Sequence, residues 1–256
     1  MIDLNDIRAG LTAGEFFLEY LPTISLQDGR CVGAEALARW QRPSGIVAPH
    51  DFIPIVENTP LSGLITYWVI ETAAAEVGDW LRANDDVHLS FNVPPELFGR
   101  GGLEYVANKT GLKDLSRKIV LEVTERSVPD KMGVDAIVTA SKHYGVRIAL
   151  DDVNVSGANL IVLSRCHVAI IKLDKTLVEE LGQGREEPPW LAGLSSLLGT
   201  TPLEIIAEGV ETAAQCVALR RAGIRLAQGF FFSPPLRAKP FVEFFLARLP
   251  PVPTAP

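Results

Sequence analysis

Two adjacent carboxylates, Asp151 and Asp152, follow an apolar run that is typical of a buried strand. Neighbouring negative charges repel each other, and they are costly beside an apolar core unless a cation compensates them. Other apolar runs also end in polar residues, namely Glu35, Asn92, Glu122, Lys172, Asp174, Glu208 and Gln228. Oxygen ligands without histidine suit Mg²⁺ or Mn²⁺ rather than zinc. We therefore predict a site for two such ions, with Asp151 bridging them and Asp152 completing the second.

Lys172 is a cation among these acids, and the sequence leaves three roles open for it. It can form an ordinary ion pair, act as a Schiff-base nucleophile, or stand beside a metal-bound water. Surrounding acids raise the pKa of a lysine, which disfavours the Schiff-base role. A single acid at a strand end is more often a helix cap or an ion-pair partner. The metal hypothesis therefore depends on the presence of several acids at the strand ends. The four histidines follow no ligand spacing, and we interpret them as structural or surface residues.

Eight short apolar runs are predicted to be the strands that position these side chains. The runs cover residues 15–26, 31–40, 87–93, 118–123, 146–152, 168–174, 203–209 and 225–233. Helical patterns cover residues 62–83, 102–112, 131–144, 157–165, 188–199, 212–222 and 239–249. The Asp-Gly turn within "QDGR" predicts a hairpin between the first two strands, whereas the later strands alternate with helices.

This order of elements predicts an α/β fold, a TIM-like (β/α)8 barrel whose first strand is antiparallel. Continuous apolar runs indicate strands that are buried on both faces, as in a parallel sheet. The carboxyl ends of parallel barrel strands meet at one rim, where we expect the polar residues to gather. An open doubly wound sheet is the competing fold. It is weakened because no Gly-rich dinucleotide motif follows an early strand.

Composition narrows the class of protein. The 256 residues are 47% hydrophobic and carry a net charge of −7, which argues against a general nucleic-acid-binding surface. Three distant cysteines form no zinc spacing and no disulfide framework, which favours a reducing compartment. Neither a signal peptide nor a membrane-spanning run is apparent, so we expect a cytoplasmic protein without membrane contact. Residues 1–250 are predicted to form a single domain, and the Pro-rich residues 251–256 a disordered tail.

Seven sequence motifs occur in an order that is typical of one protein family. In order, they are "GAEALARW", "FIPIVE", "LEVTE", "DD", "IIKLD", "IAEGVET" and "QGFFFSPPL". With them, residues 12–248 resemble the EAL family of cyclic-di-GMP phosphodiesterases. The resemblance implies the same barrel and hydrolysis of cyclic-di-GMP to linear pGpG by in-line displacement with two metal ions, in bacterial second-messenger signalling. It also implies a homodimer and, in a longer parent protein, an upstream sensor or GGDEF domain.

The resemblance also implies a role for each site residue. The implied metal ligands are Glu35, Asn92, Glu122, Asp151, Asp152 and Glu208. Lys172 would bind the attacking water, and Glu35 and Glu208 would act with it in catalysis. Arg39 would contact a phosphate of the ligand, and Leu37 would pack against that ligand. Four further residues would support the water, the metals or the neighbouring loop, namely Asp174, Glu211, Gln228 and Glu125.

The loop after the paired aspartates departs from the family pattern. Active members usually continue as "DDFGTGYSSL", whereas this chain reads "DDVNVSGANL" and has Asn154 and Ser156 in place of glycines. Glycine permits backbone conformations that other residues enter less readily, and degeneration of this loop is associated with weak or lost hydrolysis. Three interpretations therefore stay open. They are a working phosphodiesterase, a weak or silent domain that binds cyclic-di-GMP or a protein, and an unrelated metal-dependent barrel enzyme such as an enolase-like lyase.

Overall fold

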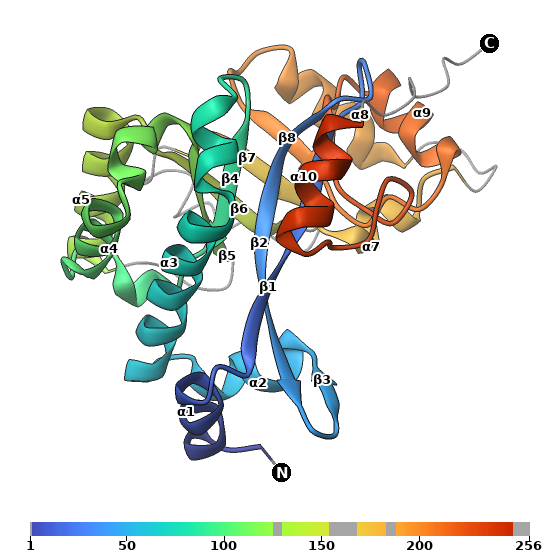
Figure 1. The fold of residues 1–256 in the computed structure, drawn as a ribbon. Coiled ribbons are helices and arrows are strands. Elements are labelled where there is room, and N and C mark those ends of the chain that lie inside the picture. The colour runs from blue at the N-terminus through green and yellow to red at the C-terminus, as the bar shows by residue number, and fades with distance from the viewer. Residues whose placement is uncertain (1, 125–129, 154–167, 183–187, 248–256) are drawn as a thin grey trace.

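The strands close into an eight-stranded barrel in the computed structural model, which describes residues 2–124, 130–153, 168–182 and 188–247 (Figure 1). Around the ring the hydrogen-bonded neighbours are, in order, β1 (Phe16–Ser25), β9 (Leu226–Ala227), β8 (Glu204–Ala207), β7 (Ile170–Leu173), β6 (Arg147–Val153), β5 (Ile119–Thr124), β4 (His88–Asn92) and β2 (Cys31–Arg42), and β1 pairs with β2 to close the ring. β1 is antiparallel to both of its neighbours, and every other pairing within the barrel is parallel. The predicted barrel with an antiparallel first strand is therefore confirmed, and the open doubly wound sheet is excluded.

Each predicted strand is present. A further short strand, β3 (Gly45–Val47), pairs with β2 outside the barrel. The prediction of a strand over residues 225–233 was too long. The chain turns at Gly229, which has a φ of 152° and lies so close to Val210 that a Cβ atom would approach its carbonyl oxygen to 2.2 Å.

Helices follow most of the strands. The α-helices are α1 (Leu4–Thr12), α2 (Pro49–Val56), α3 (Pro60–Ala83), α4 (Gly102–Thr110), α5 (Lys131–Thr139), α7 (Lys175–Glu179), α8 (Pro189–Leu198), α9 (Ala213–Arg221) and α10 (Ala238–Leu246). Short 3-10 segments are η1 (Pro95–Leu97) and η2 (Leu112–Lys118), and η3 (Ala140–Tyr144) is a π-helical turn. The short helices α1, α2 and α7 were not predicted from the sequence. The predicted helix over 157–165 lies outside the described residues.

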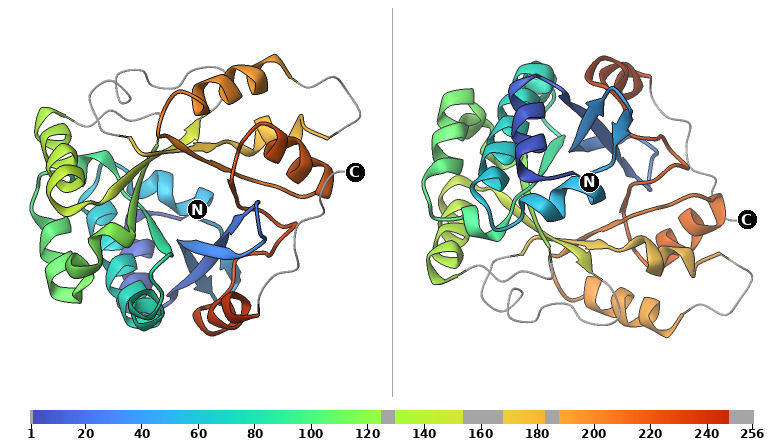
Figure 2. Two further views of the ribbon diagram at one scale, coloured as in Figure 1. Left: turned by 90° about the horizontal axis from the view of Figure 1, so that it is seen from above. Right: turned by 90° about the horizontal axis from the view of Figure 1, so that it is seen from below.

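The helices surround the ring of strands on its outer side (Figure 2). The larger apolar core lies between strands and helices, and a smaller cluster of Val120, Ala149, Ile170 and Ile206 fills the inside of the barrel. α1, α2 and β3 gather at the end of the long ribbon that β1 and β2 form (Figure 1). There Phe16 stacks on Trp40 with ring centroids 5.2 Å apart. Phe16 and Trp40 are also partners in the antiparallel register, so their stacking stabilises this end of the ribbon.

Membrane contact and cysteine chemistry are the two expectations that concern the surroundings of the protein. Among the described residues, no helix combines the length and the hydropathy needed to cross a bilayer. Cys31 and Cys216 are buried free thiols, and Cys166 lies outside the described residues.

Candidate metal centre and catalytic site

Lys172 occupies the centre of the barrel mouth. Its side chain is 1% exposed, and its Nζ lies within 3.1 Å of four carboxylates. The distances are 3.0 Å to Glu35, 2.8 Å to Glu122, 3.1 Å to Asp151 and 2.8 Å to Glu208. These acids come from four different strands or strand ends, so the closure of the barrel is what brings them together. The structure thus places four of the six predicted metal ligands around the predicted catalytic lysine.

The parallel register aligns these residues at one level of the barrel. Glu35 lies opposite Ser90, and two residues further along β4 Asn92 lies opposite Glu122 of β5. Asn92 Nδ2 donates a hydrogen bond of 2.7 Å to Glu35 Oε1. Because alternate residues of a strand face the same side, Glu35, Asn92 and Glu122 all enter the mouth above the apolar filling of the barrel.

Burial and mutual repulsion shift the pKa values of this cluster. Burial, together with the nearby charges of Glu35 and Asp151, raises the pKa of Glu122 well above its usual range. Burial raises the pKa of Glu208 to about 8, although the Lys172 ammonium acts against this shift. Burial disfavours the charged form of Lys172, but the four carboxylates outweigh burial and raise its pKa. Burial also disfavours ionised Glu35, yet Lys172 and Asn92 hold its pKa below the usual value. These shifts are the expected response of four acids that share one ammonium, and a further cation among them would favour their ionised forms.

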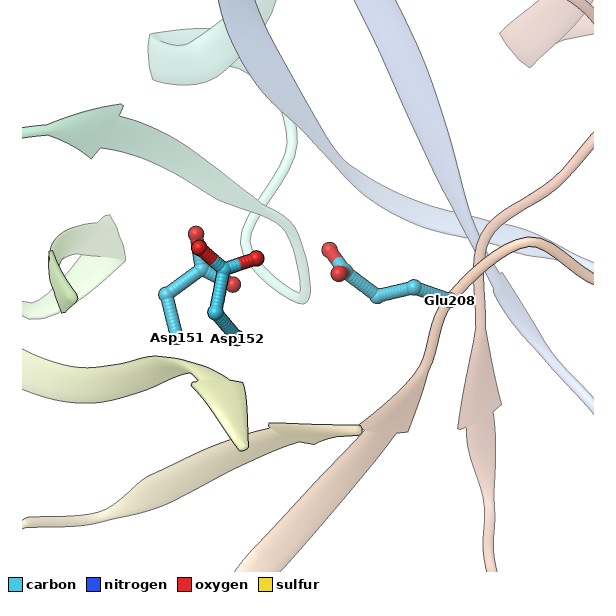
Figure 3. A group of neighbouring side chains, drawn as sticks. All are labelled: Asp151, Asp152 and Glu208. Carbon is cyan, nitrogen blue, oxygen red and sulfur yellow. The ribbon is translucent and has the colours of Figure 1, made fainter. Parts of the chain in front are cut away.

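Asp152 joins this cluster through an irregularity in β6. In a regular strand Asp151 and Asp152 would point to opposite faces, but the register with β7 shifts between Leu150 and Val153. Asp152 also has a φ of 59°, which is rare for a residue other than glycine. As a result, oxygen atoms of Asp151, Asp152 and Glu208 lie within 4.8 Å of one another, with the two aspartates facing Glu208 (Figure 3).

The donor atoms at the mouth fit a divalent cation. Carboxylate oxygens from several strands converge there, and such ligands suit Mg²⁺ or Mn²⁺. Buried Glu122 Oε1 and Asp151 Oδ1 accept no hydrogen bond from any described residue, although the latter lies near the Lys172 ammonium. Unpartnered buried oxygens of this kind are expected where an ion completes the site. Among the described residues, Asp151, Asp152 and Glu208 are the acids whose oxygens lie close enough together to share one ion, and the full set of six ligands stays a prediction.

The other predicted site residues lie around this centre with partners of their own. Gln228 is fully buried, and its Nε2 donates a hydrogen bond of 3.0 Å to Thr23 Oγ1. Asp174 is the N-cap of α7 and accepts a hydrogen bond of 2.8 Å from the Thr176 backbone. Arg39 does not point freely into the mouth, since its Nε lies 2.8 Å from Glu19 Oε2. These contacts give each residue a structural role beside any role in ligand binding.

Three predicted residues lie further out or cannot be placed. Leu37 is half-buried and lines a cleft of about 440 Å³ that runs from Glu35 to α2 and the start of α3. Glu211 is exposed in the turn before α9, where its backbone donates to Gln215 Oε1 at 2.8 Å. Glu125 lies outside the described residues, as do Asn154 and Ser156 of the altered loop.

Sequence reasoning missed Glu19, the ion-pair partner of Arg39. A signal for it was present, because the predicted hairpin between the first two strands implies neighbours across the pair. In the actual register Glu19 lies opposite Leu37, and Phe17 lies opposite Arg39. A carboxylate diagonal to an arginine on one face of an antiparallel pair is within contact range. The exact register, which decides the contact, was not predictable from the turn alone.

Comparison with known proteins agrees with this geometry. The family model described as the EAL domain matches residues 4–235. The "Probable cyclic di-GMP phosphodiesterase PdeB" of Escherichia coli is 32% identical over 89% of this chain and 44% of its own length. The "Uncharacterized protein Rv1354c" of Mycobacterium tuberculosis is 34% identical over 96% of this chain and 40% of its own length. This chain thus spans less than half the length of either relative.

Solved structures share the fold. The EAL enzyme Bd1971, in its form with bound cAMP and cyclic-di-GMP, superposes with a TM-score of 0.83 and 28% identity. That alignment covers 94% of this chain and 67% of the other. The PaMucR phosphodiesterase in complex with c-di-GMP gives a TM-score of 0.81 at 30% identity, covering 93% of this chain and 98% of the other.

Proposed function

Since this chain belongs to the EAL domain family, we propose that it is a phosphodiesterase that hydrolyses cyclic-di-GMP to linear pGpG with two divalent cations. The observation that carries the proposal is the ring of four carboxylates around buried Lys172. Relatives and structural neighbours bearing names of cyclic-di-GMP phosphodiesterases or complexes support the choice of substrate. The third interpretation, an unrelated barrel enzyme such as an enolase-like lyase, is wrong because the family match covers most of the chain.

The residues of the barrel mouth would have two kinds of role, binding of the metal ions and catalysis. Glu35, Asn92, Glu122, Asp151, Asp152 and Glu208 would hold the two ions. When bound, these ions would lower the pKa of a water molecule and absorb charge on the phosphoryl oxygens. Lys172, held by four carboxylates, would orient the attacking water for in-line displacement. Glu208, whose carboxylate lies 2.8 Å from Lys172 Nζ, would act beside that lysine as a ligand of one ion.

The second candidate function is a weak or silent domain that binds cyclic-di-GMP or a protein. The sequence "DDVNVSGANL" favours it, because Asn154 and Ser156 replace glycines that active members use after the paired aspartates. The cluster of acids at the barrel mouth, with Asp151, Asp152 and Glu208 within reach of one ion, favours the enzyme. We therefore propose turnover as the primary function and binding without turnover as the alternative.

Further expectations extend the proposal to the setting of the domain. We propose Mg²⁺ or Mn²⁺ as the resident ions, a cytoplasmic location, and a homodimer. An upstream sensor or GGDEF domain is proposed for the longer parent protein, and the relative MucR of Pseudomonas aeruginosa is named as a bifunctional diguanylate cyclase/cyclic di-GMP phosphodiesterase. Residues 1–250 as one domain and 251–256 as a disordered tail stay predictions.

The decisive experiment is a chromatographic assay for pGpG. Purified protein is incubated with cyclic-di-GMP and Mg²⁺ or Mn²⁺, beside Glu35→Ala and the surface control Glu104→Ala. We expect pGpG from the unmodified protein and from Glu104→Ala, and none from Glu35→Ala with its fold intact. Absence of pGpG from the unmodified protein would contradict turnover. Calorimetry with Ca²⁺ then decides whether the domain binds the dinucleotide as a receptor.

A further inference from the structure

Four side chains share one face of the ribbon that β1 and β2 form. Phe17 lies opposite Arg39 in the antiparallel register, and Glu19 contacts Arg39. Arg237, which immediately precedes α10, has its guanidinium carbon 4.0 Å from the centre of the Phe17 ring. Because strand residues alternate between faces, Arg39 is on the same face as Glu35, four residues earlier on β2. This Phe17–Arg39–Arg237 face therefore continues the wall of the metal centre beyond the rim.

The two arginines of this face differ in their charge balance. Arg39 is only 15% exposed, and it is neutralised by Glu19 and bound through Nη1 to the Ala38 carbonyl oxygen at 3.0 Å. Arg237 is exposed, and no carboxylate of the described residues lies within 4.0 Å of its guanidinium. The antiparallel bridge between Tyr20 and Leu236 anchors the segment that carries Arg237. The cation that this face offers to a ligand is therefore Arg237.

We propose that Arg237 binds the phosphate of the dinucleotide that lies away from the metal centre. This inference rests on the proposed function, in which the other phosphate is at the metal ions. A guanidinium presents a planar fork of donors that matches phosphate oxygens, and stacking on Phe17 limits its freedom before the ligand arrives. The chain has a net charge of −7 and an acidic mouth, so an unpaired cation beside the mouth offsets repulsion of an anionic ligand.

Steady-state kinetics of three variants test the role of Arg237. Arg237→Ala removes the charge, Arg237→Lys keeps the charge but loses the planar fork, and Arg225→Ala is the control. Arg225 is an exposed arginine that precedes β9 and therefore lies at the opposite end of the barrel. We expect Arg237→Ala to raise the KM for cyclic-di-GMP about tenfold with little change in kcat, which is the loss of one charged hydrogen bond. The KM of Arg237→Lys should lie between those of Arg237→Ala and the unmodified protein. The KM of Arg225→Ala should equal that of the unmodified protein.

Two further readouts separate a phosphate contact from a structural effect. Bis(p-nitrophenyl) phosphate has no second phosphate, so its turnover should be equal in Arg237→Ala and the unmodified protein. The gap in KM between these two proteins should narrow as NaCl is raised, because salt screens an exposed charge. An unchanged KM for cyclic-di-GMP, or an equal loss with both substrates, would overturn the inference.

The proposed function can fail separately from this inference. If the unmodified protein binds cyclic-di-GMP with Ca²⁺ but does not hydrolyse it, turnover fails, and the same variants are compared by calorimetry. About tenfold weaker binding by Arg237→Ala then supports the inference, and equal binding overturns it. If the unmodified protein neither binds nor hydrolyses the dinucleotide, both proposals are wrong.

Discussion

Replacement of Lys172 by methionine should destabilise the metal-free protein strongly. Methionine is similar in length but has no charge, so the variant leaves four carboxylates in the mouth without the ammonium that lies within 3.1 Å of each. Breaking a buried ion pair by removal of one partner typically costs about 3–5 kcal/mol, since the remaining charge is buried and unpaired. For a chain of this size that loss lowers Tm by roughly 10 °C.

The assay is urea unfolding of both proteins with EDTA and again with excess Mn²⁺. We expect the full loss in EDTA, and substantial recovery with Mn²⁺ because the ion replaces the missing positive charge and binds only the folded state. Lys109→Met is the control, since Lys109 forms a comparable contact of 2.7 Å with Glu71 but on the surface, where such pairs contribute little. A loss in EDTA below about 1 kcal/mol, or one no larger than that of Lys109→Met, would refute the assignment of Lys172 as the internal counterion.

Three further outcomes follow from other parts of the structure. A raised pKa in the folded state favours proton uptake by the folded protein. The metal-free protein should therefore gain about 2 kcal/mol of stability through Glu208 as pH falls from 8 to 6. In urea unfolding, Glu208→Gln should lack this dependence of the free energy of unfolding on pH. Burial, with the charges of nearby cations, lowers the pKa of His88 to about 3. Neutral His88 therefore contributes fully to the free energy of unfolding above pH 6.5, and this contribution should fall by about 2 kcal/mol between pH 7 and 5. His88→Gln should lack that decrease, and an unchanged slope would contradict the assignment. Gly229→Ala should lower the free energy of unfolding by about 2–3 kcal/mol, because the new Cβ would meet the Val210 carbonyl oxygen. The control Gly193→Ala in α8 places its Cβ where no atom lies within 4 Å, so it should be neutral or slightly stabilising. Equal Tm values for the two variants would contradict this prediction.

The arrangement of strands was predictable because its signals are local. Apolar runs separated by helical patterns indicate a parallel sheet, and the Asp-Gly turn before Cys31 indicates an initial hairpin. The carboxyl ends of parallel strands meet at one rim, so the convergence of Glu35, Glu122 and Glu208 could be expected without coordinates. Short helices such as α1 were not predicted, because nine residues with a capping box at Asp3 give only a weak periodic signal.

The barrel and the kinds of atoms at its mouth thus follow from the linear order of residues, whereas the charge balance of the mouth follows from tertiary packing. Lys172 and Glu35 are 137 residues apart, and their contact depends on how the ring of strands closes. The bulge that turns Asp152 toward Glu208 depends on the register between β6 and β7. The ion pair that neutralises Arg39 with Glu19 depends in the same way on the register between β1 and β2. Register is set by packing across the whole sheet, and a shift by one residue would send each of these side chains to the other face.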